Sequence, residues 1–315
     1  MITINQNMDE YNLKSIRTKF KQNGVFYTPR GQAEFIKSFL PETVNEVYDP
    51  TCGDGGLLSV FSDNVKKYGQ ELDSEQLKIA QNRLSNFIGV AGDTLVSPAF
   101  MNRKFDNIVA NYPFSIKWTP PAQDMFNTDP RFVGLPVLPP PSKADYAFIL
   151  HCLYLLSDTG TAVIMGFPGI LYRGQKEQKI RQWLVDNNYI DKVVSIPGNK
   201  FVDTPIATCL LIIRKNKTTT DILFIDSENN LEKVVGYDDI KNNDYNLSVN
   251  TYVAPEPHKE QIDPIELEMK LRQGCIRQLR AHLEFSKKIA EFENLDFHVF
   301  VNELQNLINE YKEQQ

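Results

Sequence analysis

The sequence has few cysteines and lacks a long apolar run. Its four cysteines, Cys52, Cys152, Cys209 and Cys275, are far apart and form no C-x-x-C pair. This spacing argues against a structural zinc site or a disulfide framework, and it predicts reduced thiols in the core. No apolar stretch approaches the ~18 residues that cross a bilayer. The polar N-terminus has no basic start followed by an apolar stretch, as a signal peptide has. We therefore expect a cytoplasmic protein with no metal site.

A global excess of basic residues is also absent. The 315 residues include 34 Lys and Arg against 40 Asp and Glu, for a formal net charge of −6. A protein that holds nucleic acid by itself is usually basic, because neutralising phosphates dominates the affinity. Residues 166–220 are locally basic, with nine Lys or Arg against four Asp or Glu. This stretch is either a nucleic-acid footprint or a solvated helix face.

Strand-like and helix-like segments alternate from Arg30 onward. Strands are predicted at Glu46–Asp49, Tyr68–Leu72, Ile88–Ala91, Phe105–Ala110, Thr161–Phe167, Lys192–Ile196 and Ala207–Arg214. Helices are predicted at Leu57–Lys67, Ser74–Phe87, Lys143–Leu156 and Gln175–Asn187. This alternation predicts an α/β protein with a Rossmann-like, mostly parallel, seven-stranded sheet and helices on both faces. A long proline-rich loop, residues 112–142, interrupts the pattern and is of the kind that is usually functional or mobile.

We expect three regions along the chain. Residues 1–24 form a polar N-terminal arm, residues 25–220 form the α/β domain, and residues 221–315 form a mainly helical C-terminal extension. Within the extension, Pro257–Asn294 and Phe297–Lys312 have apolar residues at helical spacing. Such helices either pack on the parent domain or bind a partner, and the sequence leaves both interpretations open.

Three turns after successive predicted strands could together hold a nucleotide-like ligand. The glycine-rich segment Asp49–Gly56 lets the backbone approach a ligand, and the helix predicted after it would offer free N–H groups. The segment departs from G-x-G-x-x-G, which disfavours a dehydrogenase. Glu71 could accept both hydroxyls of a ribose; Asp73 competes for that role or caps the next helix. Asp93, after the third strand, could accept a hydrogen bond from an adenine amino group.

The segment Asn111-Tyr112-Pro113-Phe114 follows the fourth predicted strand. The amino nitrogen of adenine is a poor nucleophile because its lone pair is delocalised into the ring. Two acceptors that hold its hydrogens would localise that lone pair, and the Asn111 side chain and the Tyr112 carbonyl could be those acceptors. Pro113 stiffens the turn, and Phe114 could stack on a base extruded from a duplex. The alternative is a plain surface turn.

Together these motifs resemble the modification subunit of type I restriction–modification systems, within the N6-adenine DNA methyltransferases. The resemblance covers Val25 to Lys217 in consistent order. Its motifs are Phe26–Pro29 (the opening motif), Asp49–Gly56 (the cofactor loop, typically D-P-x-C-G-S-G, with Asp54 as a departure), Gly69–Glu71 (the ribose step), Gly92–Leu95 (the adenosine step) and Ala110–Phe114 (A-N-P-P-F). Three later segments are similar to type I subunits in particular: Lys143–Phe148, Gly169–Arg181 and Phe201–Cys209.

The resemblance implies a class I methyltransferase that transfers a methyl group directly from S-adenosylmethionine to N6 of adenine in DNA. The implied catalytic residues are Asn111, Tyr112, Pro113 and Phe114. The implied cofactor-binding residues are Tyr27, Thr28, Asp49, Thr51, Cys52, Gly53, Gly55, Glu71, Asp93 and Asn111. No segment resembles a sequence-reading domain, so we expect a separate specificity subunit, docked on the C-terminal helices, to select the DNA target. A restriction subunit is a further candidate partner.

Two departures from the family keep alternatives open. Tyr112 replaces the first proline of A-N-P-P-F; a backbone carbonyl is available from any residue, so the chemistry can survive. The family usually has a helical domain before the opening motif, where this chain has only an arm. A methyltransferase relic that binds without turnover is therefore one alternative. A glutamine-amide protein methyltransferase and an RNA adenine methyltransferase are others, and the type I-like segments between residues 143 and 209 argue against both.

Overall fold

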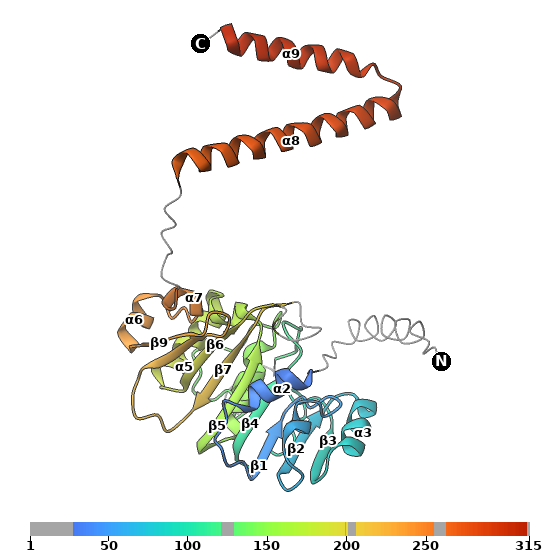
Figure 1. Cartoon of the computed structure of the whole chain (residues 1–315). Helices are drawn as coiled ribbons and strands as arrows, with labels where there is room; N and C mark the ends of the chain where they lie inside the picture. Colours follow the sequence, from blue (N-terminus) through green and yellow to red (C-terminus); the bar gives the residue numbers. More distant parts are fainter. Residues whose placement is uncertain (1–27, 121–128, 199, 201–205, 255–262, 314–315) are drawn as a thin grey trace, which may run out of the picture. The chain divides into compact units, whose positions relative to one another are not determined.

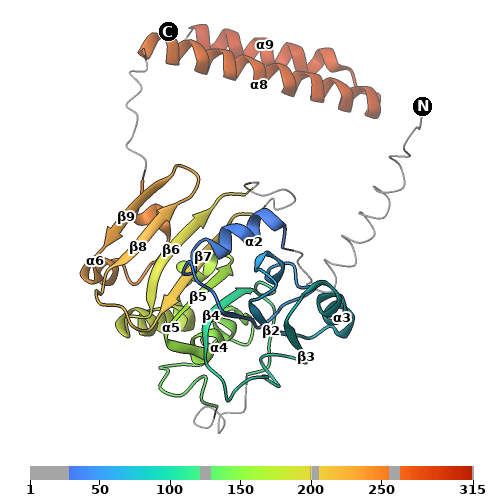
Figure 2. The same ribbon diagram turned by 60° about the horizontal axis from the view of Figure 1, so that its bottom comes forward.

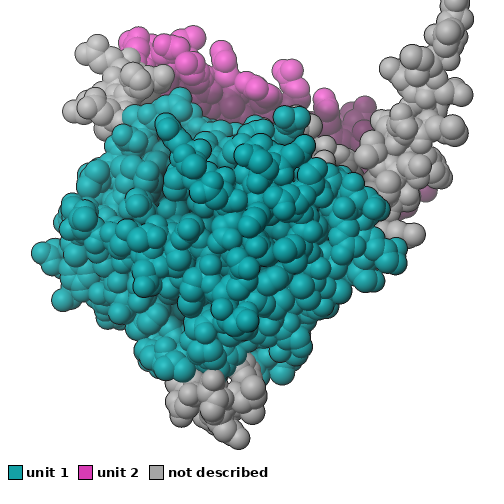
Figure 3. All heavy atoms as spheres, turned by 90° about the horizontal axis from the view of Figure 1, so that it is seen from below, with its two compact units in different colours: residues 1–255 teal, residues 256–315 magenta. Residues whose placement is uncertain are grey.

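The computed structural model describes residues 28–120, 129–198, 200, 206–254 and 263–313. The chain divides into two compact units, residues 1–255 and residues 256–315 (Figure 3). The first unit contains the sheet and its helices, and the second contains two long helices (Figure 1).

A nine-stranded sheet runs through the described part of the first unit in the order β3-β2-β1-β4-β5-β7-β6-β8-β9, with β3 and β9 at its edges (Figure 2). Its strands are β1 (Glu46–Asp49), β2 (Lys66–Glu71), β3 (Phe87–Ala91), β4 (Phe105–Asn111), β5 (Leu156–Gly166), β6 (Ile190–Ile196), β7 (Thr208–Arg214), β8 (Ile222–Asp226) and β9 (Leu231–Val235). The first five strands pair in parallel, and β7 runs antiparallel between β5 and β6. The first seven strands confirm the predicted doubly wound sheet.

Helices cover both faces of the sheet. They are α2 (Arg30–Lys37), α3 (Ser74–Arg83), α4 (Asp145–Leu155), α5 (Gln175–Asp186), α6 (Tyr237–Asn242) and α7 (Val249–Tyr252), with short 3-10 helices η1 (Leu58–Val60) and η3 (Pro168–Leu171). Successive residues of β4 alternate between two apolar clusters. Ile108 and Ala110 pack with residues of α4 and α5, and Val109 packs with residues of α2 and α3. This double burial explains why the strand reads as a continuous apolar run.

The predicted helix at Leu57–Lys67 is wrong. Only η1 forms there, and β2 begins at Lys66. Leu57, Leu58, Val60 and Phe61 are all buried, so the apolar residues of this segment do not form the single stripe of a surface helix. The chain instead turns tightly from the glycine-rich loop into the second strand.

The first unit extends beyond the boundary predicted at residue 220. β8 pairs in parallel with β6, and β9 pairs with β8, so the sheet continues into the expected extension. Phe224 of β8 is buried against Tyr252 of α7, with ring centroids 4.4 Å apart. This contact explains why residues up to 255 belong to the first unit. The predicted arm, residues 1–24, lies outside the described residues.

The second unit is a pair of helices, α8 (Pro264–Glu293) and α9 (Phe297–Glu313), in the segments where the sequence pattern is helical. The Asp263 side chain accepts the Ile265 N–H and caps α8, and Asn294 ends that helix in the left-handed conformation. Cys275 is exposed on α8, so the expectation of core thiols holds for the other three cysteines only. Among the described residues, no helix is both long and apolar enough to cross a membrane.

Candidate active site

A pocket of about 300 Å³ lies at the carboxyl ends of β1, β2, β3 and β4. Parallel strands end at the same edge of a sheet, so the turns that follow them in sequence meet there. Six residues expected from the sequence line this pocket: Thr51, Gly53, Glu71, Asp93, Asn111 and Pro113. Six others do not line it: Thr28, Asp49, Cys52, Gly55, Tyr112 and Phe114. Tyr27 lies outside the described residues.

The glycine-rich loop is fastened to the end of β2. Gly53 has a φ of +54°, and its N–H donates to Oε2 of Glu71 over 2.8 Å. Gly55 has a φ of +82°, and a Cβ there would lie 2.8 Å from Leu84 Cδ1. Gly55 is therefore required by its backbone and by the lack of space for a side chain, and Gly53 is favoured by its left-handed backbone. Because only η1 follows the loop, the expected N-terminal dipole of an α-helix is missing from this side of the pocket.

Glu71 and Asp73 have different roles in the structure. The Asp73 side chain accepts the N–H groups of Glu75 and Gln76 and caps α3. Glu71 lines the pocket, and its Oε1 accepts the Asp73 N–H over 2.9 Å. Each oxygen of Glu71 thus accepts one backbone N–H and retains capacity for a second donor. The geometry favours Glu71 over Asp73 as the acceptor for ligand hydroxyls.

The turn after β3 is held from two sides. Oδ1 of Asp93 accepts the Leu95 N–H over 2.8 Å. The buried Arg131, which comes from the proline-rich loop, donates to the carbonyls of Thr94 and Leu95 over 3.0 and 2.8 Å. Its charge is paired with Asp129, 2.6 Å away. Sequence reasoning missed Arg131, because no local pattern shows that an arginine in a loop is buried.

Asp49 holds the start of the glycine-rich loop through a hydrogen bond. It is buried at 2 % exposure, and its Oδ1 accepts the Thr51 N–H over 2.9 Å. Burial raises the pKa of the Asp49 carboxyl to about 7; the nearby Glu71 adds to the rise, and the Thr51 N–H opposes it. Burial likewise raises the pKa of the Cys52 thiol.

Asn111 ends β4 with one half of its amide satisfied and the other half free. Its Nδ2 donates to Oγ1 of Thr28 over 3.0 Å, and this bond fixes the orientation of the amide. Its Oδ1 is buried and has no hydrogen-bond partner within the described part of the chain. A buried acceptor without a donor is costly. In a residue that lines a pocket, such an oxygen is the place for a ligand N–H.

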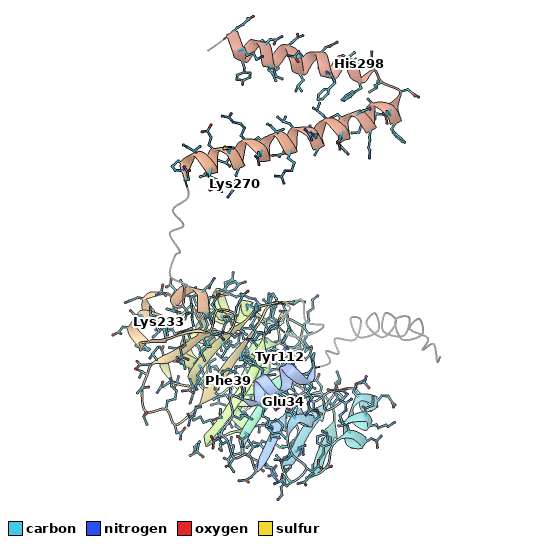
Figure 4. The ribbon with its side chains drawn as sticks, viewed as in Figure 1. Glu34, Phe39, Tyr112, Lys233, Lys270 and His298 are labelled. Carbon is cyan, nitrogen blue, oxygen red and sulfur yellow. The ribbon has the colours of Figure 1, made fainter. Side chains whose placement is uncertain are left out.

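The Tyr112 ring is accommodated in the core beneath the pocket. It is fully buried and stacked on Phe148, with centroids 5.0 Å apart and planes at 11°. Phe114 meets it edge-on at 5.7 Å. Tyr112 lies inside the first unit (Figure 4). The ring that replaces the family's proline therefore does not occupy the pocket, and its backbone carbonyl is the group left for an acceptor role.

The proline-rich loop supplies a wall of the pocket that sequence reasoning missed: Ile116, Lys117, Trp118 and Thr119. Trp118 Nε1 donates to the Pro140 carbonyl over 3.0 Å, and its ring lies 5.8 Å from that of Phe132. A tryptophan inside a long loop was the available signal, since a large aromatic side chain needs a packing partner.

Residues 5–235 match the family model of the N-6 DNA Methylase family. The chain belongs to this family. The match covers the whole pocket and all nine strands of the sheet, and it confirms the predicted N6-adenine DNA methyltransferase resemblance.

Methylase subunits of type I restriction enzymes are similar in sequence and in structure. The type I restriction enzyme MpnII methylase subunit of Mycoplasma pneumoniae is 34% identical over 300 residues, covering 77% of this chain and 55% of that protein. The type I restriction–modification methyltransferase subunit of Streptococcus thermophilus is 30% identical with a TM-score of 0.67, covering 73% of this chain and 59% of that one. The chain spans about half the length of the curated relatives it matches.

The fold also matches a more distant structure. A Listeria monocytogenes protein described as a class I S-adenosylmethionine-dependent methyltransferase has a TM-score of 0.52 at 15% identity, covering 71% of this chain and 75% of that one. At that identity the likeness shows the fold alone. It confirms the predicted fold class.

The raised pKa of Asp49 predicts how stability depends on pH. The folded-state pKa of about 7 exceeds the ordinary aspartate pKa of 3.8. The folded chain therefore holds a proton that the unfolded chain releases, and stability falls as the pH rises from about 4 to about 7. Relative to Asp49→Asn, the free energy of unfolding of the wild type should fall by roughly 4 kcal/mol at most across this range.

Urea unfolding of both proteins between pH 4.5 and 8 measures this difference. Glu42→Gln, at an exposed carboxylate, is the control. Parallel stability curves for the wild type and Asp49→Asn would contradict the prediction.

Proposed function

We propose that the chain binds S-adenosylmethionine in the pocket at the carboxyl ends of β1 to β4 and methylates N6 of adenine in DNA. The observation that carries the proposal is the buried, unpartnered Oδ1 of Asn111. This oxygen lies at the end of β4, where the family has its methyl-acceptor motif. The Tyr112 carbonyl, one residue further on, is the second proposed acceptor.

The pocket fits the chemistry of the cofactor. Glu71 would hold the ribose hydroxyls, and Asp93 would accept from the adenine amino group. Leu72, Leu95, Trp118 and Phe148 also line the pocket and offer apolar surface to a purine ring. Thr51 and Gly53 line the same pocket beside Glu71, where the methionine part would lie. When bound, the cofactor supplies a methyl group activated by a sulfonium.

The remaining contribution of the chain is positioning, which can account for most of the rate when the methyl donor is reactive. Asn111 Oδ1 and the Tyr112 carbonyl would each accept one hydrogen of the adenine amine and localise its lone pair. The Thr28 hydroxyl keeps Oδ1 of Asn111 turned toward the amine by occupying Nδ2. Phe114, which packs edge-on against Tyr112, would stack on the extruded base.

The chain depends on a partner for DNA recognition in this proposal. Its charge is −6, and several residues of the basic stretch are used internally. Arg181 is buried, and Lys215 and Lys217 donate to the carbonyls of Leu156 and Ile190. The locally basic composition thus supplies less exposed positive charge than the sequence suggested, and a specificity subunit would supply target selection.

The second unit is the proposed docking surface for that subunit. α8 and α9 contact each other yet leave many apolar side chains exposed. The exposed apolar residues include Ile265, Leu271, Ile276, Leu279, Phe285, Phe292, Val299 and Tyr311. The relatives are named as methylase subunits of restriction enzymes, which implies assembly with other chains. Helices of a specificity subunit would cover this apolar surface.

The function is tested by methyl transfer. The full chain, with a specificity subunit, should transfer label from S-adenosylmethionine to unmethylated DNA, and nuclease digestion should yield N6-methyladenine. Asn111→Ala removes the free acceptor and should lower kcat by about 10²-fold, as the loss of one preorganised transition-state contact does. Asn64→Ala, at an exposed position before β2, is the control. Label on a protein glutamine or on RNA alone would replace the proposal, and cofactor binding without any transfer would indicate a relic.

The docking surface is tested by deleting residues 256–315. The first unit has its own core and contains every residue that lines the pocket, so the shortened chain should bind S-adenosylmethionine within about twofold of the full chain. It should no longer copurify with the specificity subunit. Leu279→Asp in the full chain should weaken the complex, and Lys270→Ala on the same helix should not. A complex that survives the deletion would contradict the assignment.

A further inference from the structure

Ser115, the residue after the methyl-acceptor motif, has an unusual backbone. Its φ is +55°, a left-handed conformation that few residues other than glycine adopt. Such a conformation persists only where the surrounding structure holds it. Two contacts do so here. The Ser115 N–H donates to Oδ1 of Asp145 over 3.3 Å, and its hydroxyl accepts from Nη2 of Arg173 over 3.2 Å.

The two groups that hold Ser115 come from different elements. Asp145 is the first residue of α4 and is fully buried. Arg173 lies between η3 and α5, and its Nη1 donates to Oε1 of Glu177 over 3.1 Å and lies 3.8 Å from Oδ2 of Asp145. One guanidinium thus joins the turn after β4 to both α4 and α5.

The guanidinium of Arg173 is itself fixed in place. It lies over Gly169, where a Cβ would stand 2.4 to 2.7 Å from its atoms. The Arg173 carbonyl accepts from Nη1 of the buried Arg181 over 3.0 Å. Since its backbone and its charged end are both held, Arg173 presents a rigid donor to Ser115.

We propose that Arg173 and Asp145 are positioning residues for methyl transfer. By holding Ser115 in the left-handed conformation, they set the turn that carries the Tyr112 carbonyl and the Asn111 side chain toward the acceptor amine. This inference rests on the proposed function. Arg173 and Asp145 do not line the pocket, so they act through Ser115. The competing role for Arg173 is direct contact with a DNA phosphate.

The first experiment separates catalysis from cofactor binding. Arg173→Gln in the full chain should lower kcat by about 10²-fold, as displacement of a positioned group does, and leave the Kd for S-adenosylmethionine within about twofold. Arg173→Lys keeps the positive charge beside buried Asp145 and Glu177, which guards against misfolding, and should have an intermediate kcat. Arg103→Gln is the control, because Arg103 pairs with Glu46 at the opposite end of the strands. An unchanged kcat in Arg173→Gln would overturn the inference.

Substitutions at Ser115 distinguish positioning from DNA contact. Ser115→Ala loses the hydroxyl and still needs the left-handed backbone, so its kcat should fall as in Arg173→Gln, and the double variant should be no worse. Ser115→Gly adopts this backbone freely and should restore part of the kcat lost in Arg173→Gln. Three results together would assign Arg173 to phosphate contact: the fold losses in kcat of the two single variants multiply in the double variant, Ser115→Gly restores no kcat, and Arg173→Gln weakens the salt dependence of DNA binding. These results would overturn the inference.

Amide hydrogen exchange tests the same inference without catalysis. Exchange in residues 112–118 should be faster in Arg173→Gln than in the wild type, and unchanged in Arg103→Gln. If the wild type transfers no methyl group, the proposed function fails, and this exchange measurement alone decides whether Arg173 holds the turn. Equal exchange in Arg173→Gln and the wild type would overturn the inference.

Discussion

The parallel pairing of β1 with β2 on one side and β4 on the other is the constraint on which the site depends. The register places Asp49 opposite Gly69, and a Cβ at Gly69 would lie 2.7 Å from Cys52 Sγ. The absence of a side chain at that position lets the glycine-rich loop fold against β2, where Glu71 accepts the Gly53 N–H. The same pairing brings Asn111, at the carboxyl end of β4, to the end of the sheet where Glu71 and Asp93, the two carboxylates of the pocket, also lie.

Two arginines from outside the strand ends fix the turns that β pairing leaves free. Arg131 ties the proline-rich loop to the carbonyls of the turn after β3. Arg173 ties α5 to the turn after β4 through Ser115. Both guanidiniums are paired with carboxylates, so their charge is satisfied while their remaining donors orient the backbone. The strands set where the ligand-facing groups meet, and the arginines set how those groups point.

The sequence predicted the parts of this arrangement that local patterns encode. Most of the first seven strands contain apolar runs between turn residues, and the turns after β1 to β4 carry recognisable glycine, carboxylate and amide residues. The helix predicted at residues 57–67 does not form. Its apolar residues are buried in consecutive positions, so they do not mark one face of a helix. β9 was missed because its middle residues are exposed and lack an apolar face. The conformation of Ser115 depends on Asp145 and Arg173, 30 and 58 residues away, and no local pattern reports such contacts.

Titration calorimetry of the full chain with S-adenosylmethionine is the decisive measurement, because every proposed role requires that ligand in the pocket of β1 to β4. We expect micromolar binding that is lost in Asp93→Ala and kept in Asp158→Ala, a substitution at an exposed carboxylate. Binding that survives Asp93→Ala would place the cofactor elsewhere. Absence of binding, both for the chain alone and for its complex with a specificity subunit, would rule out the proposed function.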